Sequence, residues 1–188
     1  MSIQDVFRRV TSALDRAGIA YMLSGSFASA YYGATRSTQD IDIVIDASSS
    51  QLRSFIDSLA AREFYSDLDS ALEAHLHQSM FNVIDQAAGW KIDFIIRKSR
   101  PFSQEEFRRR KAATLLGVDL FMTTAEDAVI SKLEWARKAQ SSRQIEDVAA
   151  ILRAQGNTLD RAYLQGWVAE LTLQTEWEHA YRLAAIVD

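Results

Sequence analysis

Apolar residues recur along this chain with two different spacings, which alternate over the first two thirds of the sequence. Where they fall three or four positions apart, they predict the buried face of an amphipathic helix, as in the run that follows Ser2. Helices of this kind are predicted to begin near residues 2, 26, 48, 103, 124, 141, 159 and 175. Short apolar or alternating runs instead predict strands over residues 19–23, 41–45, 80–85, 90–97 and 118–122.

Some segments carry more specific expectations. The two strand-like runs on either side of Gly89 are separated by a short loop, which predicts a β-hairpin. Residues 103–113 predict a polar helix that starts with a capping box formed by its serine and Glu106. Residues 64–78 follow neither spacing, and we expect a loop with a helical turn there.

No strand pattern follows residue 124, and helical spacing continues towards the C-terminus. The sequence therefore predicts an α/β (α+β) fold in which a mixed sheet is flanked by helices. The expected domains are an α/β core over residues 1–122 and a helical C-terminal subdomain over residues 123–188.

The composition excludes several classes of site and partner. The 188 residues include no cysteine, which excludes disulfides, thiolate metal sites and cysteine nucleophiles. A net charge of −4 gives no general attraction for nucleic acid. The N-terminal residues show no secretory signal and no apolar run reaches membrane-spanning length, so we expect a cytoplasmic protein with no membrane partner.

The stretch over residues 23–46 carries the clearest chemical signal. Asp40 and Asp42 lie two positions apart in a predicted strand, so both carboxylates point to the same face. Neighbouring carboxylates repel each other and are tolerated mainly where a cation lies between them. Upstream, Gly25 permits a sharp turn, and Ser26 is expected to cap a helix whose free N–H groups suit a phosphate. Together these features predict a site for a nucleotide and a metal ion.

This arrangement resembles the nucleotidyltransferase superfamily of DNA polymerase beta. The family signature is an apolar residue and a Gly-Ser pair at a helix start, then Asp-x-Asp on the next strand, then a third carboxylate on a later strand. Here the matching positions are Gly25, Ser26, Asp40, Asp42 and Asp93. The resemblance implies a nucleotidyltransferase-like fold in which the three aspartates are catalytic and bind Mg²⁺ or Mn²⁺. It also implies that Gly25 and Ser26 bind the β- and γ-phosphates, and that Asp93 helps to activate the attacking hydroxyl.

Two other segments match one bacterial branch of this superfamily. Arg36 and Thr38 stand in an Arg-x-Thr-x-Asp-x-Asp pattern that resembles the abortive-infection (AbiEii-type) branch. The resemblance implies contacts with the nucleotide phosphates, or with the acceptor in the case of Arg36. That branch also has a lysine on a C-terminal helix that contacts the triphosphate, followed by a basic stretch and an aspartate. Lys132, Arg143 and Asp147 match this second pattern. A solvated loop for Arg36 and a solvated helix face for Lys132 are the open alternatives.

Two further features have alternative interpretations. Asp85, on the first arm of the predicted hairpin, is the substitute for Asp93 as the third carboxylate. The basic stretch over residues 97–111 suits an RNA acceptor. However, Glu105 and Glu106 precede its arginines by one turn, which favours a surface helix that pairs with itself.

The resemblance implies an enzyme that moves an NMP from an NTP, ATP or another, to a hydroxyl acceptor and releases pyrophosphate. The abortive-infection branch implies a toxin of a toxin–antitoxin or phage-defence module that acts on tRNA and has a cognate antitoxin. Antibiotic nucleotidyltransferases and protein-modifying adenylyltransferases share the same core, so a small molecule or a protein is an alternative acceptor. A second class of function is a catalytically inactive nucleotide-binding or interaction module. A third is a two-metal phosphoesterase, which normally needs more His and Asp ligands than this sequence arranges.

Overall fold

The chain folds into two compact units. A computed structural model describes residues 2–34 and 38–185. We call residues 1–24 and 38–122 the sheet unit, and residues 25–37 and 123–188 the helical unit. The segment that follows the first strand therefore groups with the C-terminal helices, whereas the expected domains place it in the core.

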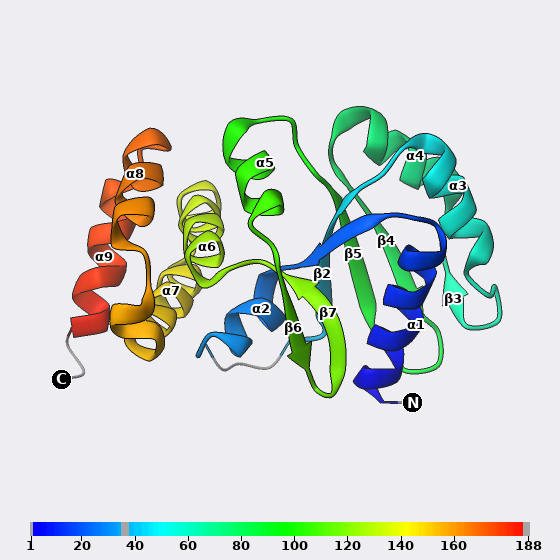
Figure 1. Ribbon diagram of the computed structural model, residues 1–188, viewed down its shortest axis with the longest axis horizontal. Helices are drawn as coiled ribbons and strands as arrows, with labels where there is room; N and C mark the ends of the chain where they lie inside the picture. The colour runs from blue at the N-terminus through cyan, green and yellow to red at the C-terminus, as the bar shows by residue number, and fades with distance from the viewer. Residues whose placement is uncertain (1, 35–37, 186–188) are drawn as a thin grey trace. The chain divides into compact units, whose positions relative to one another are not determined.

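The strands of the described residues all belong to the sheet unit, where they form one mixed sheet in the order β3-β4-β5-β2-β1-β7-β6 (Figure 1). They are β1 (Ala20–Leu23), β2 (Asp40–Asp46), β3 (Phe64–Tyr65), β4 (Met80–Asp85), β5 (Lys91–Ile96), β6 (Lys111–Leu115) and β7 (Val118–Met122). The pairs β2/β5 and β1/β7 run parallel, and the other neighbouring pairs are antiparallel. This confirms the predicted mixed sheet and the predicted hairpin around Gly89.

Helices cover one face of this sheet. The helices of the sheet unit are α1 (Ile3–Arg16), α3 (Ser49–Ser58), α4 (Leu68–His77) and α5 (Pro101–Arg108). α1, α3 and α4 gather on the same side of the sheet (Figure 1). There Phe55 of α3 packs edge-on against Phe94 of β5 with ring centroids 5.1 Å apart, and Phe94 stacks on Phe81 of β4 at 5.2 Å. Because side chains alternate along a strand, the neighbours of Phe94 on β5 point to the other face.

The expectation of a loop over residues 64–78 is wrong. The segment contains the short strand β3 and the helix α4, which begins after Asp67, whose carboxylate accepts a hydrogen bond from the Asp69 N–H at 3.0 Å. The helix buries only small side chains, those of Ala71 and Ala74, while Leu76 is 76% exposed. Its apolar pattern is therefore too weak to reveal the buried face from the sequence.

The predicted helix over residues 103–113 is also partly wrong. α5 begins at Pro101, a residue that suits the first turn of a helix because its missing N–H has no partner there in any case. Ser103 and Glu106 lie within this helix, and both side chains are buried. They do not form a capping box at the start of the helix. The helix ends at Arg108, and the residues after it form β6, an edge strand that pairs with β7.

The helical unit contains α2 (Gly25–Tyr31), α6 (Ala125–Ala139), α7 (Ser142–Gln155), α8 (Arg161–Glu170) and α9 (Gln174–Ala185). The described part of this unit has no strand, as the sequence predicts. α6 and α7 pack against each other, and each has fully buried residues, such as Leu133 in α6 and Val148 in α7. Among the residues that the structure describes, no helix has the length and apolar character needed to cross a membrane.

Candidate functional site

The three aspartates of the predicted site lie on one face of the sheet unit. Along β2 the isoleucines are buried, whereas Asp40 is exposed and Asp42 is half-buried on the alternate positions. In the parallel ladder between β2 and β5, Asp42 lies directly opposite Asp93. Neighbouring strands are about 4.8 Å apart, so these two carboxylates start from adjacent backbone positions. The structure therefore places Asp40, Asp42 and Asp93 on one face of the sheet, with Asp42 and Asp93 side by side on neighbouring strands. The period of the strand predicts the shared face for the first two.

Both carboxylate oxygens of Asp93 have partners from the sheet. The side chain is 9% exposed, and its Oδ2 accepts a hydrogen bond from the Nζ of Lys91 at 2.9 Å. Its Oδ1 accepts a hydrogen bond from the Nδ2 of Asn82, which lies directly opposite on β4. These two partners are absent from the family signature. Lys91 could have been found from the strand period, since it stands two positions before Asp93, but Asn82 emerges only from the hairpin register.

Lys91 places a positive charge among the three carboxylates. The hydrogen bond to Asp93 raises the pKa of the Lys91 ammonium against the opposing effect of partial burial, and the negative charges of Asp93, Asp40 and Asp42 raise it further. In the ladder, Lys91 is the register partner of Asp40. Its side chain remains 44% exposed, so the ammonium also reaches water.

The donor set consists of carboxylate oxygens, which are the ligands that Mg²⁺ and Mn²⁺ prefer. Within residues 2–34 and 38–185, however, no group of three or more His, Asp or Glu side chains is arranged to hold a metal ion. At Asp93 the positive charge comes instead from Lys91. The carboxylates of Asp40, Asp42 and Asp93 are therefore suitable ligands for a divalent cation. In this structure, the ammonium of Lys91 balances the negative charge of Asp93.

The backbone around the paired aspartates is fixed at two points. The Thr38 hydroxyl accepts a hydrogen bond from the Asp40 N–H at 3.2 Å and donates one to the Asp40 carbonyl at 3.2 Å. The Ser24 N–H donates to the Asp42 carbonyl at 2.9 Å, which ties the end of β1 to β2. Thr38 therefore has a local structural role at the start of β2. Arg36 lies outside the described residues.

Gly25 is the first residue of α2 and has φ +60°, a left-handed conformation that glycine adopts without strain. Ser26 follows Gly25 in the first turn of α2, and its expected capping role stays a prediction. Both residues belong to the helical unit.

Lys132 is buried, which contradicts the alternative of a solvated helix face. Its Nζ lies 2.6 Å from the Oδ2 of Asp147 and also donates to the Oε1 of Gln144 at 3.0 Å. The side chains of Lys132 and Asp147 are only 6% and 8% exposed. The structure therefore brings together two of the residues that match the bacterial branch, as an ion pair that joins α6 to α7.

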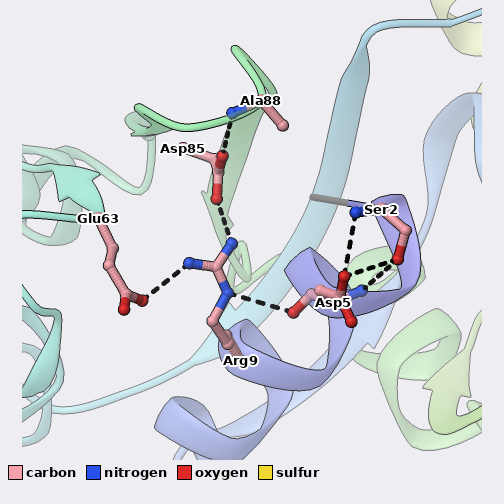
Figure 2. Close-up of polar contacts among 6 residues, drawn as sticks. All are labelled: Ser2, Asp5, Arg9, Glu63, Asp85 and Ala88. Carbon is pink, nitrogen blue, oxygen red and sulfur yellow. Dashed lines mark hydrogen bonds and ion pairs between the residues drawn. The ribbon is translucent and has the colours of Figure 1, made fainter.

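Asp85 lies on the face of the sheet that is opposite to Asp93. It is fully buried and accepts hydrogen bonds from the guanidinium of Arg9 and from the Ala88 N–H at 2.7 Å (Figure 2). Arg9 also donates to the carboxylate of Glu63 at 2.8 Å (Figure 2). Asp85 thus ties the β4–β5 hairpin to α1 and does not take the place of Asp93 beside Asp42.

The basic stretch is partly neutralised by its own helix. Arg108 pairs with Glu105 one turn earlier, with Nη2 and Oε1 2.6 Å apart. This pair supports the interpretation of a self-paired surface helix.

Comparison with known proteins identifies solved structures with a similar fold. The chain matches no model of a known protein family, and no curated protein matches it. Its structure is similar to that of the antibiotic-resistance factor ANT(2'')-Ia in solution, with a TM-score of 0.56, 12% sequence identity, and coverage of 93% of this chain and 96% of the other. It is also similar to the crystal structure of ANT(2'')-Ia in complex with adenylyl-2''-tobramycin, with a TM-score of 0.56, 12% identity, and coverage of 92% and 97%. An antigenic nucleotidyltransferase-like protein from Paracoccidioides brasiliensis gives a TM-score of 0.56, 15% identity, and coverage of 96% and 91%. These likenesses confirm the expected nucleotidyltransferase-like fold.

Proposed function

We propose that this protein is a metal-dependent nucleotidyltransferase, which transfers an NMP from an NTP to a hydroxyl acceptor and releases pyrophosphate. The observation that carries the proposal is the register of β2 and β5, which sets Asp42 opposite Asp93 with Asp40 on the same face. A fold similar to that of solved nucleotidyltransferases supports it. Such a carboxylate set is unusual unless it serves a cation.

In this proposal, Asp40, Asp42 and Asp93 hold Mg²⁺ or Mn²⁺. The cation, when bound, neutralises charge on the triphosphate and polarises the α-phosphorus. Asp93 accepts the proton of the attacking hydroxyl, and its Asn82 partner keeps the carboxylate oriented while it does so. Most of the rate enhancement then comes from positioning and from neutralisation of charge.

The phosphates are proposed to bind the N–H groups and hydroxyl of Gly25 and Ser26, with help from Arg36 and Thr38. Lys132 is proposed to neutralise the leaving pyrophosphate. For Lys132 this role requires that the ion pair with Asp147 open, since the ammonium is engaged there at 2.6 Å. A purely structural role for Lys132 is the competing explanation, and the stability measurements below separate the two.

The acceptor is proposed to be a hydroxyl of tRNA, of a protein or of a small molecule. A tRNA acceptor, with a toxin–antitoxin or phage-defence role and a cognate antitoxin, follows from the AbiEii-type pattern at Arg36 and Thr38. A small-molecule acceptor is supported by the similar structure that was solved with adenylyl-2''-tobramycin.

One observation favours a second candidate, a nucleotide-binding module that has lost turnover. Both oxygens of Asp93 are engaged by Asn82 and Lys91, and the described residues contain no ready-made metal cluster. A module of this kind would bind NTP without a divalent cation and transfer nothing.

The test offers α-labelled NTPs with Mg²⁺ to the wild type and to the Asp40→Ala/Asp42→Ala double variant. RNA extract, protein extract and aminoglycosides serve as acceptors in separate reactions. Label transfer that disappears in the double variant supports the transferase, and the labelled species identifies the acceptor. NTP binding that needs no cation and leads to no transfer supports the binding module.

A further inference from the structure

We infer that Lys91 acts as the built-in counter-ion of the carboxylate face and that a divalent cation must displace its ammonium from Asp93 in order to bind. The inference rests on the proposed function, because it concerns the same three aspartates. It assigns to Lys91 the control of metal affinity, a role that the family signature gives to none of its positions.

The geometry of the ladder places Lys91 beside all three carboxylates. Lys91 and Asp93 stand two positions apart on β5, so both side chains point to the same face. Across the parallel ladder, Asp40 is the register partner of Lys91, and Asp42 is the register partner of Asp93. The four side chains thus occupy the corners of a rectangle on one face, with three negative charges and one positive charge.

The contact between Lys91 and Asp93 competes directly with a cation. The ammonium donates to Oδ2 at 2.9 Å, and the Asn82 amide donates to Oδ1, so each oxygen of Asp93 already accepts one hydrogen bond. The Asn82 amide is neutral and lies on β4, where it orients Asp93 without balancing its charge. A divalent cation on Oδ2 would lie next to the ammonium that donates to the same oxygen, so repulsion between the two positive charges drives the ammonium away.

The Lys91 side chain is free to move away from Asp93 into solvent. Its side chain is 44% exposed and has a flexible four-carbon stem, so the ammonium can turn into water. Asp93, at 9% exposure, cannot do the same. The ammonium is therefore the mobile partner of the pair, and the carboxylate is the fixed one.

The test compares Mn²⁺ binding to the wild type, to Lys91→Met and to Lys98→Met, with free Mn²⁺ measured by electron paramagnetic resonance. Lys98 is an exposed lysine just beyond β5, so its replacement changes the net charge equally but leaves the carboxylates untouched. We expect Lys91→Met to bind Mn²⁺ about tenfold more tightly than Lys98→Met. The reason is that Lys91→Met removes the positive ammonium that competes with Mn²⁺ for Asp93. We also expect a lower melting temperature for Lys91→Met without metal, with the deficit recovered at saturating Mn²⁺.

A second measurement uses the wild type alone and so does not depend on how the variants fold. Amine acetylation followed by mass spectrometry reports the reactivity of Lys91, which we expect to rise when Mn²⁺ is added, while that of Lys98 stays constant. Equal Mn²⁺ affinity of the two variants, or unchanged reactivity of Lys91, would overturn the inference.

The outcomes also distinguish this inference from the proposed function. If the wild type transfers label but Lys91→Met binds Mn²⁺ no more tightly than Lys98→Met, the inference fails and the transferase stands. If Mn²⁺ releases Lys91 but no acceptor is labelled, the inference stands and the transferase proposal fails.

Discussion

At the scale of single residues, Asp42 is the carboxylate on which the proposed transfer depends most directly. Asp42→Asn removes one negative charge and leaves the volume of the side chain unchanged. We expect the rate of transfer to fall by at least about a hundredfold, because a bound cation contributes several kcal/mol of transition-state stabilisation. Initial rates of label transfer at saturating NTP measure this loss.

The matched control is Asp46→Asn on the same strand. Asp46 pairs with Arg97, with Oδ2 and Nη2 3.0 Å apart, and lies at the far end of β2 from Asp40. Its replacement is expected to leave the rate of transfer nearly unchanged. If both variants lose activity equally, Asp42 has no special role.

Arg9 is a second residue, and its contribution to the stability of the fold can be measured by a single substitution. Arg9→Met leaves the fully buried carboxylate of Asp85 without its cation. We expect the free energy of unfolding to fall by about 3 kcal/mol, since loss of one partner from a buried ion pair strands the other charge. Urea unfolding followed by circular dichroism measures the change.

The neighbouring Arg8→Met provides the comparison. Arg8 is 57% exposed, and its nearest approach to Asp5 is 4.0 Å, so its replacement is expected to change stability little. If Arg9→Met were as mild as Arg8→Met, the buried pair with Asp85 would not be a stabilising contact.

At the scale of elements, the pair Lys132–Asp147 joins α6 to α7. Lys132→Met is expected to lower the free energy of unfolding by about 3–5 kcal/mol, because it removes the ammonium that balances the charge of the buried Asp147 carboxylate. The double variant Lys132→Met/Asp147→Leu is expected to recover most of this loss, since two apolar residues need no counter-charge. A double-mutant cycle of urea unfolding measures the coupling.

The same cycle separates the two roles of Lys132. A stable double variant that still transfers label would exclude a contact between Lys132 and the pyrophosphate. A stable double variant without transfer would support that contact.

Gly33 and α7 show how closely two elements of the helical unit approach. Gly33 has φ +116°, and a Cβ at this position would lie 2.3 Å from the Cβ of Ala154. Gly33→Ala is therefore expected to lower the free energy of unfolding by roughly 2 kcal/mol or more, from strain and overpacking together. Thermal unfolding measures the effect.

Gly166 offers the opposite case within α8. A Cβ at Gly166 would meet no atom within 4 Å, and the residue lies inside a helix. Gly166→Ala is expected to raise stability by roughly 0.5–1 kcal/mol. A destabilised Gly166→Ala beside a neutral Gly33→Ala would contradict the described packing of this unit.

The elements that the sequence predicts well are those whose buried faces are made of large apolar residues. α1 buries Val6, Phe7 and Val10 on one stripe, and the capping box of Ser2 and Asp5 marks its start. α4 is different, because its fully buried residues are alanines, two of its leucines are half-buried and Leu76 is exposed. β6 is difficult for a related reason, since its side chains at this sheet edge are exposed or half-buried and none is fully buried.

At the scale of the whole molecule, whether a site residue can be predicted depends on which feature of the fold determines its position. The period of one strand is enough to place Asp40 and Asp42 on the same face. The relation of Asp42 to Asp93 depends on which strands pair and in which register, information that a single sequence does not contain. The burial of Lys132 has the same origin, because its partner comes from the next helix.

The most direct test of nucleotidyl transfer follows two labels in parallel reactions. One reaction contains ATP labelled at the α-phosphate and the other ATP labelled at the γ-phosphate, each with Mg²⁺ and the acceptor extracts. We predict that the α-label enters the acceptor, that the γ-label leaves as pyrophosphate, and that Asp42→Asn stops both events. A γ-label that the wild type but not Asp42→Asn transfers to the acceptor would contradict nucleotidyl transfer by this protein. An α-label that stays in ATP with every acceptor would contradict it as well.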